Sequence, residues 1–227
     1  MNQLSIRGIQ FYKIPSFRGL SSEEIDRETP KGKVVLINCT GSTLRQDQDI
    51  HHDIYINNVS SLEKLILAFA NRIHSVLHMS TTHLNSPELE NEYTRAKKEC
   101  EEYLNQTASK YSFEGVNLRL PTIWSNEYLK DGSLLDDITY IDLEESINLI
   151  RFPKAIVHIA PEQSIGIQIE HFLRGDREKV CYSDLNSWTG NITQLIDLLK
   201  TEEVANSNTE NELKQIYKNW RLQKFNP

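Results

Sequence analysis

The chain has 227 residues, of which 38% are hydrophobic and 25% charged, so it can bury the core of one large domain or two small ones. No apolar run approaches the roughly 20 residues of a membrane span, and the polar start lacks the apolar core of a signal peptide. The net charge of -7, with Lys and Arg scattered, argues against a nucleic-acid-binding protein. Three widely spaced cysteines form neither a disulfide framework nor a metal motif, so we expect a cytoplasmic protein.

The first half of the chain predicts two buried strands, each followed by a loop with hydroxyl side chains. Residues 33–39 are a short apolar run rich in β-branched residues, which is typical of a strand buried on both faces, and a turn at 40–42 ends it. A second strand over 74–79 leads into the hydroxyl-rich loop 80–82. Between the two strands, apolar residues at helical spacing predict a helix that carries Leu62, Leu65, Ile66, Phe69 and Ile73.

A long helix and several shorter elements follow. Ser86, Pro87 and Glu88 predict its start, because they supply a capping hydroxyl, a proline in the first turn and an acid near the positive end of the helix dipole, and we expect it to end near Leu104. The later pattern predicts strands over 116–120, 138–142 and 155–159 and helices ending near residue 150 and over 164–173, 192–200 and 212–225.

This alternation of strands and helices implies an α/β fold in three layers with a mainly parallel sheet. We expect a core over residues 1–122, a smaller region with late core elements over 123–200, and a linker with a C-terminal helix over 201–227.

Tyr93 and Lys97 lie four residues apart on the expected long helix, and therefore on one face of it. A nearby ammonium stabilises phenolate and can lower a tyrosine pKa from about 10 toward the range that a general acid–base residue needs. The plain alternative is a core tyrosine beside a lysine that reaches to water. Thr81 follows a strand at its C-terminal end, where ligand sites of open parallel sheets lie, although such hydroxyls also serve in ordinary turns and caps.

Five segments of the chain follow the order of a known family. They are Val34-Val-Leu-Ile-Asn-Cys-Thr-Gly41, Asn58-Val59 before a helix, Val76-Leu-His-Met-Ser-Thr81, the pair Tyr93 and Lys97, and Val116-Asn-Leu-Arg-Leu-Pro-Thr122. In this order the chain resembles the extended short-chain dehydrogenase/reductase family, the NAD-dependent epimerases and dehydratases of nucleotide sugars. The resemblance covers about residues 8–200.

The resemblance implies a Rossmann-like fold with a small C-terminal substrate-side region. It also implies an NAD(P)-dependent enzyme that acts on a nucleotide sugar or a related small carbohydrate. Thr81 would take the hydroxyl role, Tyr93 would be the general acid and base, and Lys97 would bind the nicotinamide ribose while lowering the pKa of Tyr93. The cofactor-binding positions would be Thr40, Gly41, Lys97 and Pro121.

The sequence departs from this family in its glycines. The family begins with a G-x-x-G-x-x-G turn that binds the pyrophosphate of the cofactor, and the nine glycines of this chain never fall at that spacing. We therefore expect a core that is truncated at its N-terminal side. Two classes of function stay open. One is the enzyme described above, and the other is a degenerate binding or partner protein that keeps the scaffold without dinucleotide binding.

Two further expectations concern partners and metals. The predicted helix around residues 62–73 is apolar on more than one face, so we expect a second copy of the chain, or another partner chain, to cover part of it. His51, His52 and Asp53 are adjacent in the sequence and lack a third ligand at useful spacing, so we expect no metal site there.

Overall fold

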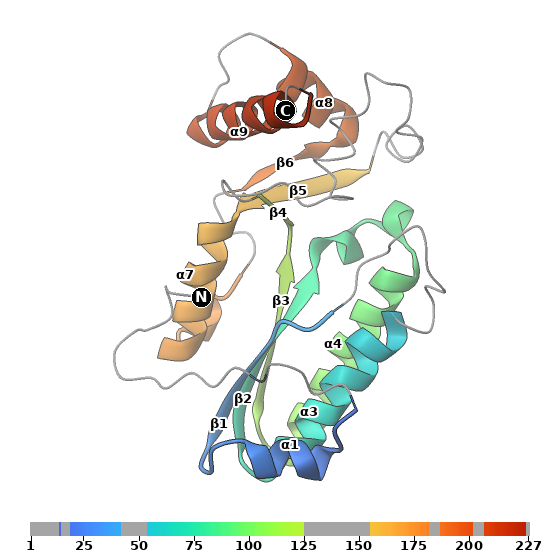
Figure 1. The fold of residues 1–227 in the computed structure, drawn as a ribbon, viewed down its shortest axis with the longest axis vertical. Helices are drawn as coiled ribbons and strands as arrows, with labels where there is room; N and C mark the ends of the chain where they lie inside the picture. Colours follow the sequence, from blue (N-terminus) through green and yellow to red (C-terminus); the bar gives the residue numbers. More distant parts are fainter. Residues whose placement is uncertain are drawn as a thin grey trace. The chain divides into compact units, whose positions relative to one another are not determined.

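The computed structural model describes residues 14, 19–41, 54–124, 155–181, 187–201 and 207–225. The chain forms two compact units (Figure 1). The first unit comprises Met1–Thr81, Asn91–Arg119 and Gly166–Cys181, and the second comprises Thr82–Glu90, Leu120–Ile165 and Tyr182–Pro227. The predicted boundaries after residues 122 and 200 stay predictions.

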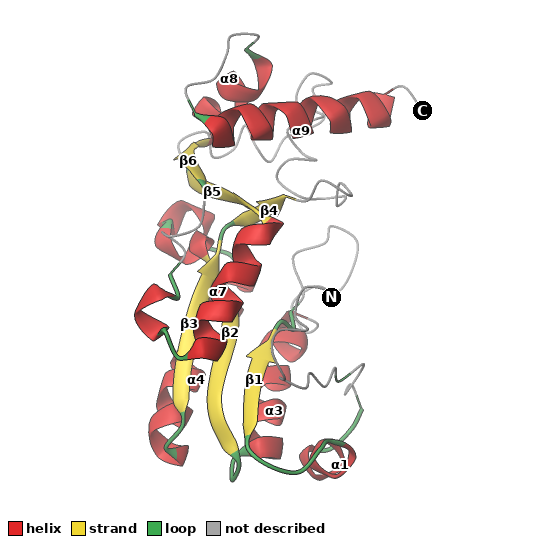
Figure 2. Ribbon diagram, turned by 90° about the vertical axis from the view of Figure 1, so that its left-hand side faces the viewer, coloured by secondary structure: helices red, strands yellow, loops and turns green. Residues whose placement is uncertain are grey.

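The first unit contains a three-stranded sheet in the order β1-β2-β3. Its strands are β1 (Val34–Asn38), β2 (Ile73–Thr81) and β3 (Glu114–Leu120). β1 and β2 are parallel, with Asn38 opposite His78 at their C-terminal ends. Figure 2 shows all three strands pointing the same way. The predicted parallel sheet is thereby confirmed in this unit.

Helices cover both faces of this sheet. Figure 1 shows α1 (Ser22–Glu28), α3 (Ser61–Phe69) and α4 (Glu92–Tyr111) on one side and α7 (Glu162–Arg174) on the other. A π-helical turn, η2 (Ile56–Ser60), leads into α3, and a short 3-10 turn, η6 (Arg177–Lys179), follows α7. The fold class of the unit is therefore the expected three-layer α/β arrangement. The core between the sheet and α1, α3 and α4 includes Ile25, Leu36, Val59, Leu62, Leu65, Ile66, Phe69, Val76, Ala96, Cys100 and Leu104.

The apolar residues that suggested a partner for α3 are mostly used within the chain. Leu62, Leu65, Ile66 and Phe69 are all buried in the core of the first unit. Leu67 is the exception, with 52% of its surface exposed. The homodimer or partner chain stays a prediction.

The second unit has its own sheet in the order β4-β5-β6. β4 (Thr122–Trp124) is parallel to β5 (Ile156–Pro161), and β5 is antiparallel to β6 (Trp188–Asn191). The described part of the unit also contains two 3-10 turns, η3 (Thr82–Asn85) and η4 (Pro87–Leu89), and two helices, α8 (Ile192–Lys200) and α9 (Asn208–Phe225). Its core includes Trp124, Val157, Ile159, Trp188, Ile192, Leu195, Leu213, Ile216 and Tyr217.

The predicted start of the long helix is wrong. Residues Pro87–Leu89 form only a 3-10 turn, and α4 begins at Glu92. Asn91 is its N-cap: the Asn91 side chain accepts a hydrogen bond from the Thr94 amide, and the Thr94 hydroxyl accepts one from the Asn91 amide. The hydroxyl of Ser86 instead donates to the carbonyl of Ile156 at 3.2 Å. The reciprocal cap at Asn91 satisfies two amides at once, which favours the later start.

Two other differences concern element boundaries. The sequence predicts that Ile73 lies on a helix, but α3 ends at Phe69 and Ile73 begins β2. The predicted strand over 138–142 and the helix ending near residue 150 lie outside the described residues. Across the described part of the chain, no helix is long and apolar enough to cross a membrane.

Candidate functional site

α4 carries three polar side chains, each four residues from the next, that contact consecutive residues at the end of β2. The contacts join Tyr93 with Thr81, Lys97 with Met79, and Glu101 with Ser80. Residues four apart on a helix share one face, so these contacts hold one edge of α4 against one strand end. The structure therefore brings together the three residues that the sequence singled out, namely Thr81, Tyr93 and Lys97.

Lys97 is buried, with only 4% of its surface exposed. Its Nζ donates to the carbonyl oxygen of Met79 at 2.9 Å and to that of Thr40 at 3.4 Å. Burial lowers the pKa of Lys97, while Cys100, Cys39 and Glu101 act in the opposite direction. The alternative in which this lysine reaches to water is therefore wrong. A desolvated ammonium with a perturbed pKa is a feature of functional sites.

Tyr93 is half-buried, and its hydroxyl is hydrogen-bonded with Thr81. Burial raises the pKa of Tyr93, and the hydrogen bond with Thr81 lowers it by less. The expected lowering of this pKa by Lys97 is not found. Burial outweighs the other effects, and the Lys97 ammonium, which donates to two backbone carbonyls, lies 5.9 Å from the centre of the Tyr93 ring.

The turn after β1 lies against the same ammonium. A Cβ atom on Gly41 would stand 2.7 Å from the Asn58 side-chain oxygen and 3.1 Å from Lys97 Nζ, so only glycine fits without a shift. The Asn58 amide donates to the carbonyl of Ile54 at 2.8 Å, within the turn that contains η2. Gly41 and Thr40 are thus both beside Lys97.

Pro121 follows β3 directly and belongs to the second unit. Its part in cofactor binding stays a prediction.

A second layer of buried polar groups supports this turn. Asn38 Oδ1 accepts from the Thr40 hydroxyl at 2.6 Å and from the Thr40 amide at 3.2 Å. The Asn38 amide donates to Nδ1 of His78 at 3.0 Å, so the ring proton of neutral His78 is assigned to Nε2. Burial, with a smaller contribution from Lys97, lowers the pKa of His78 to about 3. His78 therefore stays neutral through the physiological range.

Sequence reasoning missed Asn38, Asn58, His78 and Glu101 as members of this region. Asn58 stands in one of the segments that suggested the family, and Glu101 continues the spacing of four that links Tyr93 with Lys97. One more step of that spacing reaches Glu101, but the spacing does not indicate that its carboxylate is buried. Nothing in the local sequence distinguishes Asn38 or His78 from other polar residues in strands.

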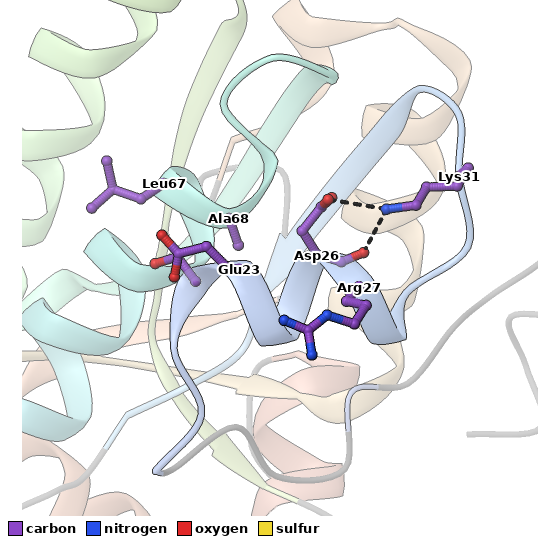
Figure 3. Close-up of a pocket in the computed structure, with 7 residues that line it drawn as sticks. Glu23, Asp26, Arg27, Lys31, Leu67 and Ala68 are labelled. Atoms are coloured by element: carbon purple, nitrogen blue, oxygen red, sulfur yellow. Dashed lines mark hydrogen bonds and ion pairs between the residues drawn. The ribbon is translucent and has the colours of Figure 1, made fainter.

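A hollow of about 400 Å³ between α1 and α3 is separate from this region (Figure 3). It is lined by Ser22, Glu23, Asp26, Arg27, Lys31, Leu67 and Ala68. The Asp26 carboxylate is engaged by Lys31 at 3.0 Å and by Arg72 at 2.6 Å. Among the described residues no three His, Cys, Asp or Glu side chains gather to hold a metal ion, and residues 51–53 lie outside that set.

No protein family and no curated protein matches the chain by sequence. Solved structures do match. UDP-glucuronic acid 4-epimerase from Bacillus cereus, in complex with NAD, is 11% identical over 92% of this chain and 78% of that one, with a TM-score of 0.63. The DesIV double mutant (dTDP-glucose 4,6-dehydratase) from Streptomyces venezuelae, with NAD and DAU bound, is 13% identical over 80% of this chain and 62% of that one, with a TM-score of 0.59.

A third match is RMD from Pseudomonas aeruginosa, complexed with NADPH. It is 15% identical over 79% of this chain and 70% of that one, with a TM-score of 0.58. Identities this low establish the fold alone. The chain has the Rossmann-like fold of the short-chain dehydrogenases and reductases to which nucleotide-sugar epimerases and dehydratases belong.

Proposed function

We propose that the chain binds NAD or NADP and acts on a nucleotide sugar or a related small carbohydrate through Thr81, Tyr93 and Lys97. The observation that carries the proposal is the hydrogen bond between Tyr93 and Thr81, one helical turn from a buried ammonium. The fold adds support, because solved structures that share it were determined in complex with NAD, NADPH or UDP-N-acetylmuramic acid.

The residues present fit a dinucleotide near Lys97. Ligands of open parallel sheets lie at the C-terminal ends of the strands, and the Lys97 ammonium lies at the ends of β1 and β2. An ammonium has three N–H donors, and two backbone carbonyls of the described residues accept from this one. A ribose hydroxyl is a suitable acceptor for the third. The bound nicotinamide supplies the hydride acceptor or donor.

Tyr93 moves the proton in this proposal. Because burial holds its pKa above the usual 10, the phenol is protonated at neutral pH and serves first as a general acid toward a substrate oxygen. Thr81 both donates and accepts through one hydroxyl, so it can orient the same substrate oxygen beside the phenol.

The test is Tyr93→Phe, which keeps the ring and removes the ionisable hydroxyl. Turnover of a panel of nucleotide sugars with NAD(H) and NADP(H) should fall by about 10²–10⁴-fold, the usual scale of general acid–base catalysis. Stability should fall by only about 1 kcal/mol, for one lost hydrogen bond. Tyr103→Phe is the matched control, because Tyr103 is also half-buried on α4 but lies outside the site. Equal turnover by the wild type and Tyr93→Phe would refute the catalytic role.

One observation favours the second class of function, a binding or partner protein without turnover. The printed sequence has no G-x-x-G-x-x-G pattern to hold a pyrophosphate. Binding isotherms with NAD(H) and NADP(H) separate the two. Saturation at micromolar concentrations favours the enzyme, whereas no binding into the millimolar range favours the degenerate protein.

A further inference from the structure

The polar contacts of α4 extend one turn beyond Lys97, to a buried carboxylate. Glu101 is 8% exposed. Its Oε1 accepts from the Ser80 hydroxyl at 2.5 Å and from Arg119 Nε at 2.9 Å, and its Oε2 accepts from Arg119 Nη2 at 2.8 Å. One carboxylate therefore joins α4, β2 and β3.

The bidentate ion pair with Arg119 fixes the position of the Glu101 carboxylate. Paired guanidinium and carboxylate groups with two parallel hydrogen bonds have a defined geometry and are stronger than neutral hydrogen bonds. Since Glu101 is held from β3, the hydroxyl of Ser80 on β2 is held with it. The end of β2 is thus anchored to α4 by a rigid group, not by packing alone.

The anchor lies between the two contacts on which the proposed chemistry depends. Ser80 is flanked by Met79, whose carbonyl accepts from Lys97, and by Thr81, whose hydroxyl bonds with Tyr93. A small displacement of this strand end along α4 would change both contacts together. The charge of Glu101 also raises the pKa of Lys97 against the effect of burial, which helps to keep that side chain cationic.

We propose that Glu101, held by Arg119, is a positioning residue that acts through Ser80 to fix Thr81 and Met79 against Tyr93 and Lys97. The inference rests on the proposed function where it concerns rate. The part of the inference that concerns geometry does not depend on the proposed function, because the hydrogen bond between Tyr93 and Thr81 can be followed without cofactor or substrate.

The decisive variant is Ser80→Ala, which cuts the link to β2 and leaves the pair of Glu101 with Arg119 intact. The readout is the ¹⁹F resonance of protein labelled with 3-fluorotyrosine, in which the Tyr93 signal is assigned by its loss in Tyr93→Phe. We expect the signal to shift and its titration to move to higher pH, because the hydrogen bond that lowers the pKa of Tyr93 is loosened. Lys97 and Cys100 also lie near Tyr93 and are unchanged in this variant.

Two further variants control this result. Ser75→Ala removes another buried hydroxyl of β2, one without a hydrogen-bond partner among the described residues, and should leave the Tyr93 signal unchanged. Ser80→Thr restores a hydroxyl at the same position and should return the signal toward that of the wild type. A Tyr93 signal that is the same in Ser80→Ala and in the wild type overturns the proposal, whatever the turnover of the two proteins.

Turnover gives the second readout. If the proposed function holds, Ser80→Ala should lower kcat by about 10–10²-fold with little change in KM, since misplaced groups slow the chemical step more than they weaken binding. Unchanged kcat in Ser80→Ala, with normal loss of activity in Tyr93→Phe, overturns the positioning role and leaves the proposed function intact. Absence of any turnover in the wild type counts against the proposed function only, and the ¹⁹F signal then decides the inference.

Discussion

Acidification should destabilise the first unit through His78. This side chain is fully buried on β2 and accepts a hydrogen bond from Asn38 at Nδ1. Burial lowers its pKa to about 3 in the folded protein, while in the unfolded chain a histidine titrates near 6.5. The folded state therefore binds fewer protons than the unfolded state between these two values. The stability contributed by neutral His78 is complete above pH 6.5 and is lost as the pH falls from 6.5 toward 3.

The two pKa values set the size of the effect. A difference of one pKa unit corresponds to about 1.4 kcal/mol, so the whole loss is about 5 kcal/mol and the part reached at pH 5 is about 2 kcal/mol. A loss of about 2 kcal/mol is a large share of the 5–15 kcal/mol that is typical of a folded domain. Other groups titrate in the same range, so the contribution of His78 must be measured as the difference between the wild type and a variant that lacks this histidine.

The assay is urea unfolding of the wild type and His78→Gln at pH 7.5 and pH 5, followed by circular dichroism. Tryptophan fluorescence is unsuitable, because Trp124, Trp188 and Trp220 all belong to the second unit. His78→Gln should be less stable at pH 7.5 but should lose about 2 kcal/mol less on acidification. His74→Gln, at an exposed position near the start of the same strand, should behave as the wild type. If the wild type and His78→Gln lose the same free energy, the buried neutral histidine is not what limits acid stability.

Two further predictions concern Lys97 and the turn beside it. Lys97→Met replaces a buried ammonium by an apolar chain of similar volume. Its unfolding free energy should be unchanged or higher, because the cost of burying a charge is removed, and the NAD(H) binding that we propose should be lost. A drop of about 3 kcal/mol in urea unfolding would instead mean that the ammonium is needed to satisfy the carbonyls of Met79 and Thr40. Gly41→Ala should cost about 1–3 kcal/mol by the same measurement, because its Cβ would stand 2.7 Å from Asn58 Oδ1. Unchanged stability would show that the turn can move away.

β1 and β2 could be predicted from the sequence because each is a short run with several β-branched or other apolar residues and a turn after it. β2 is buried along most of its length, as expected. On β1 only Leu36 and Asn38 are buried and Val35 is 43% exposed, so the expected burial on both faces is wrong for this strand. β4 and β6 could not be predicted. They have three and four residues, which is too short for a pattern, and they are strands because they pair with β5.

The candidate site could be predicted only in part, because the rest of it depends on tertiary contacts. Helical spacing places Tyr93 and Lys97 on one face, and the end of a strand places Thr81 near them. Neither pattern tells that a glutamate on the same helix is buried. Glu101 is buried because Arg119, 18 residues further along the chain, lies on β3 beside it. The predicted direction of the Tyr93 pKa is wrong because burial raises it, and burial also depends on tertiary contacts.

The two buried charges of α4 differ in the way they are compensated, and the difference bears on function. Glu101 has a charged partner, Arg119, and such a pair is a common structural element. Lys97 lies one turn away and donates to two neutral carbonyls. A lysine buried for structure alone would gain more from a carboxylate, and Glu101 is near enough to raise its pKa. With Glu101 engaged by Ser80 and Arg119, the ammonium is left with neutral partners at the ends of β1 and β2. This placement supports the ribose-binding role that we propose for Lys97, because its ammonium lies at the strand ends without a carboxylate of its own.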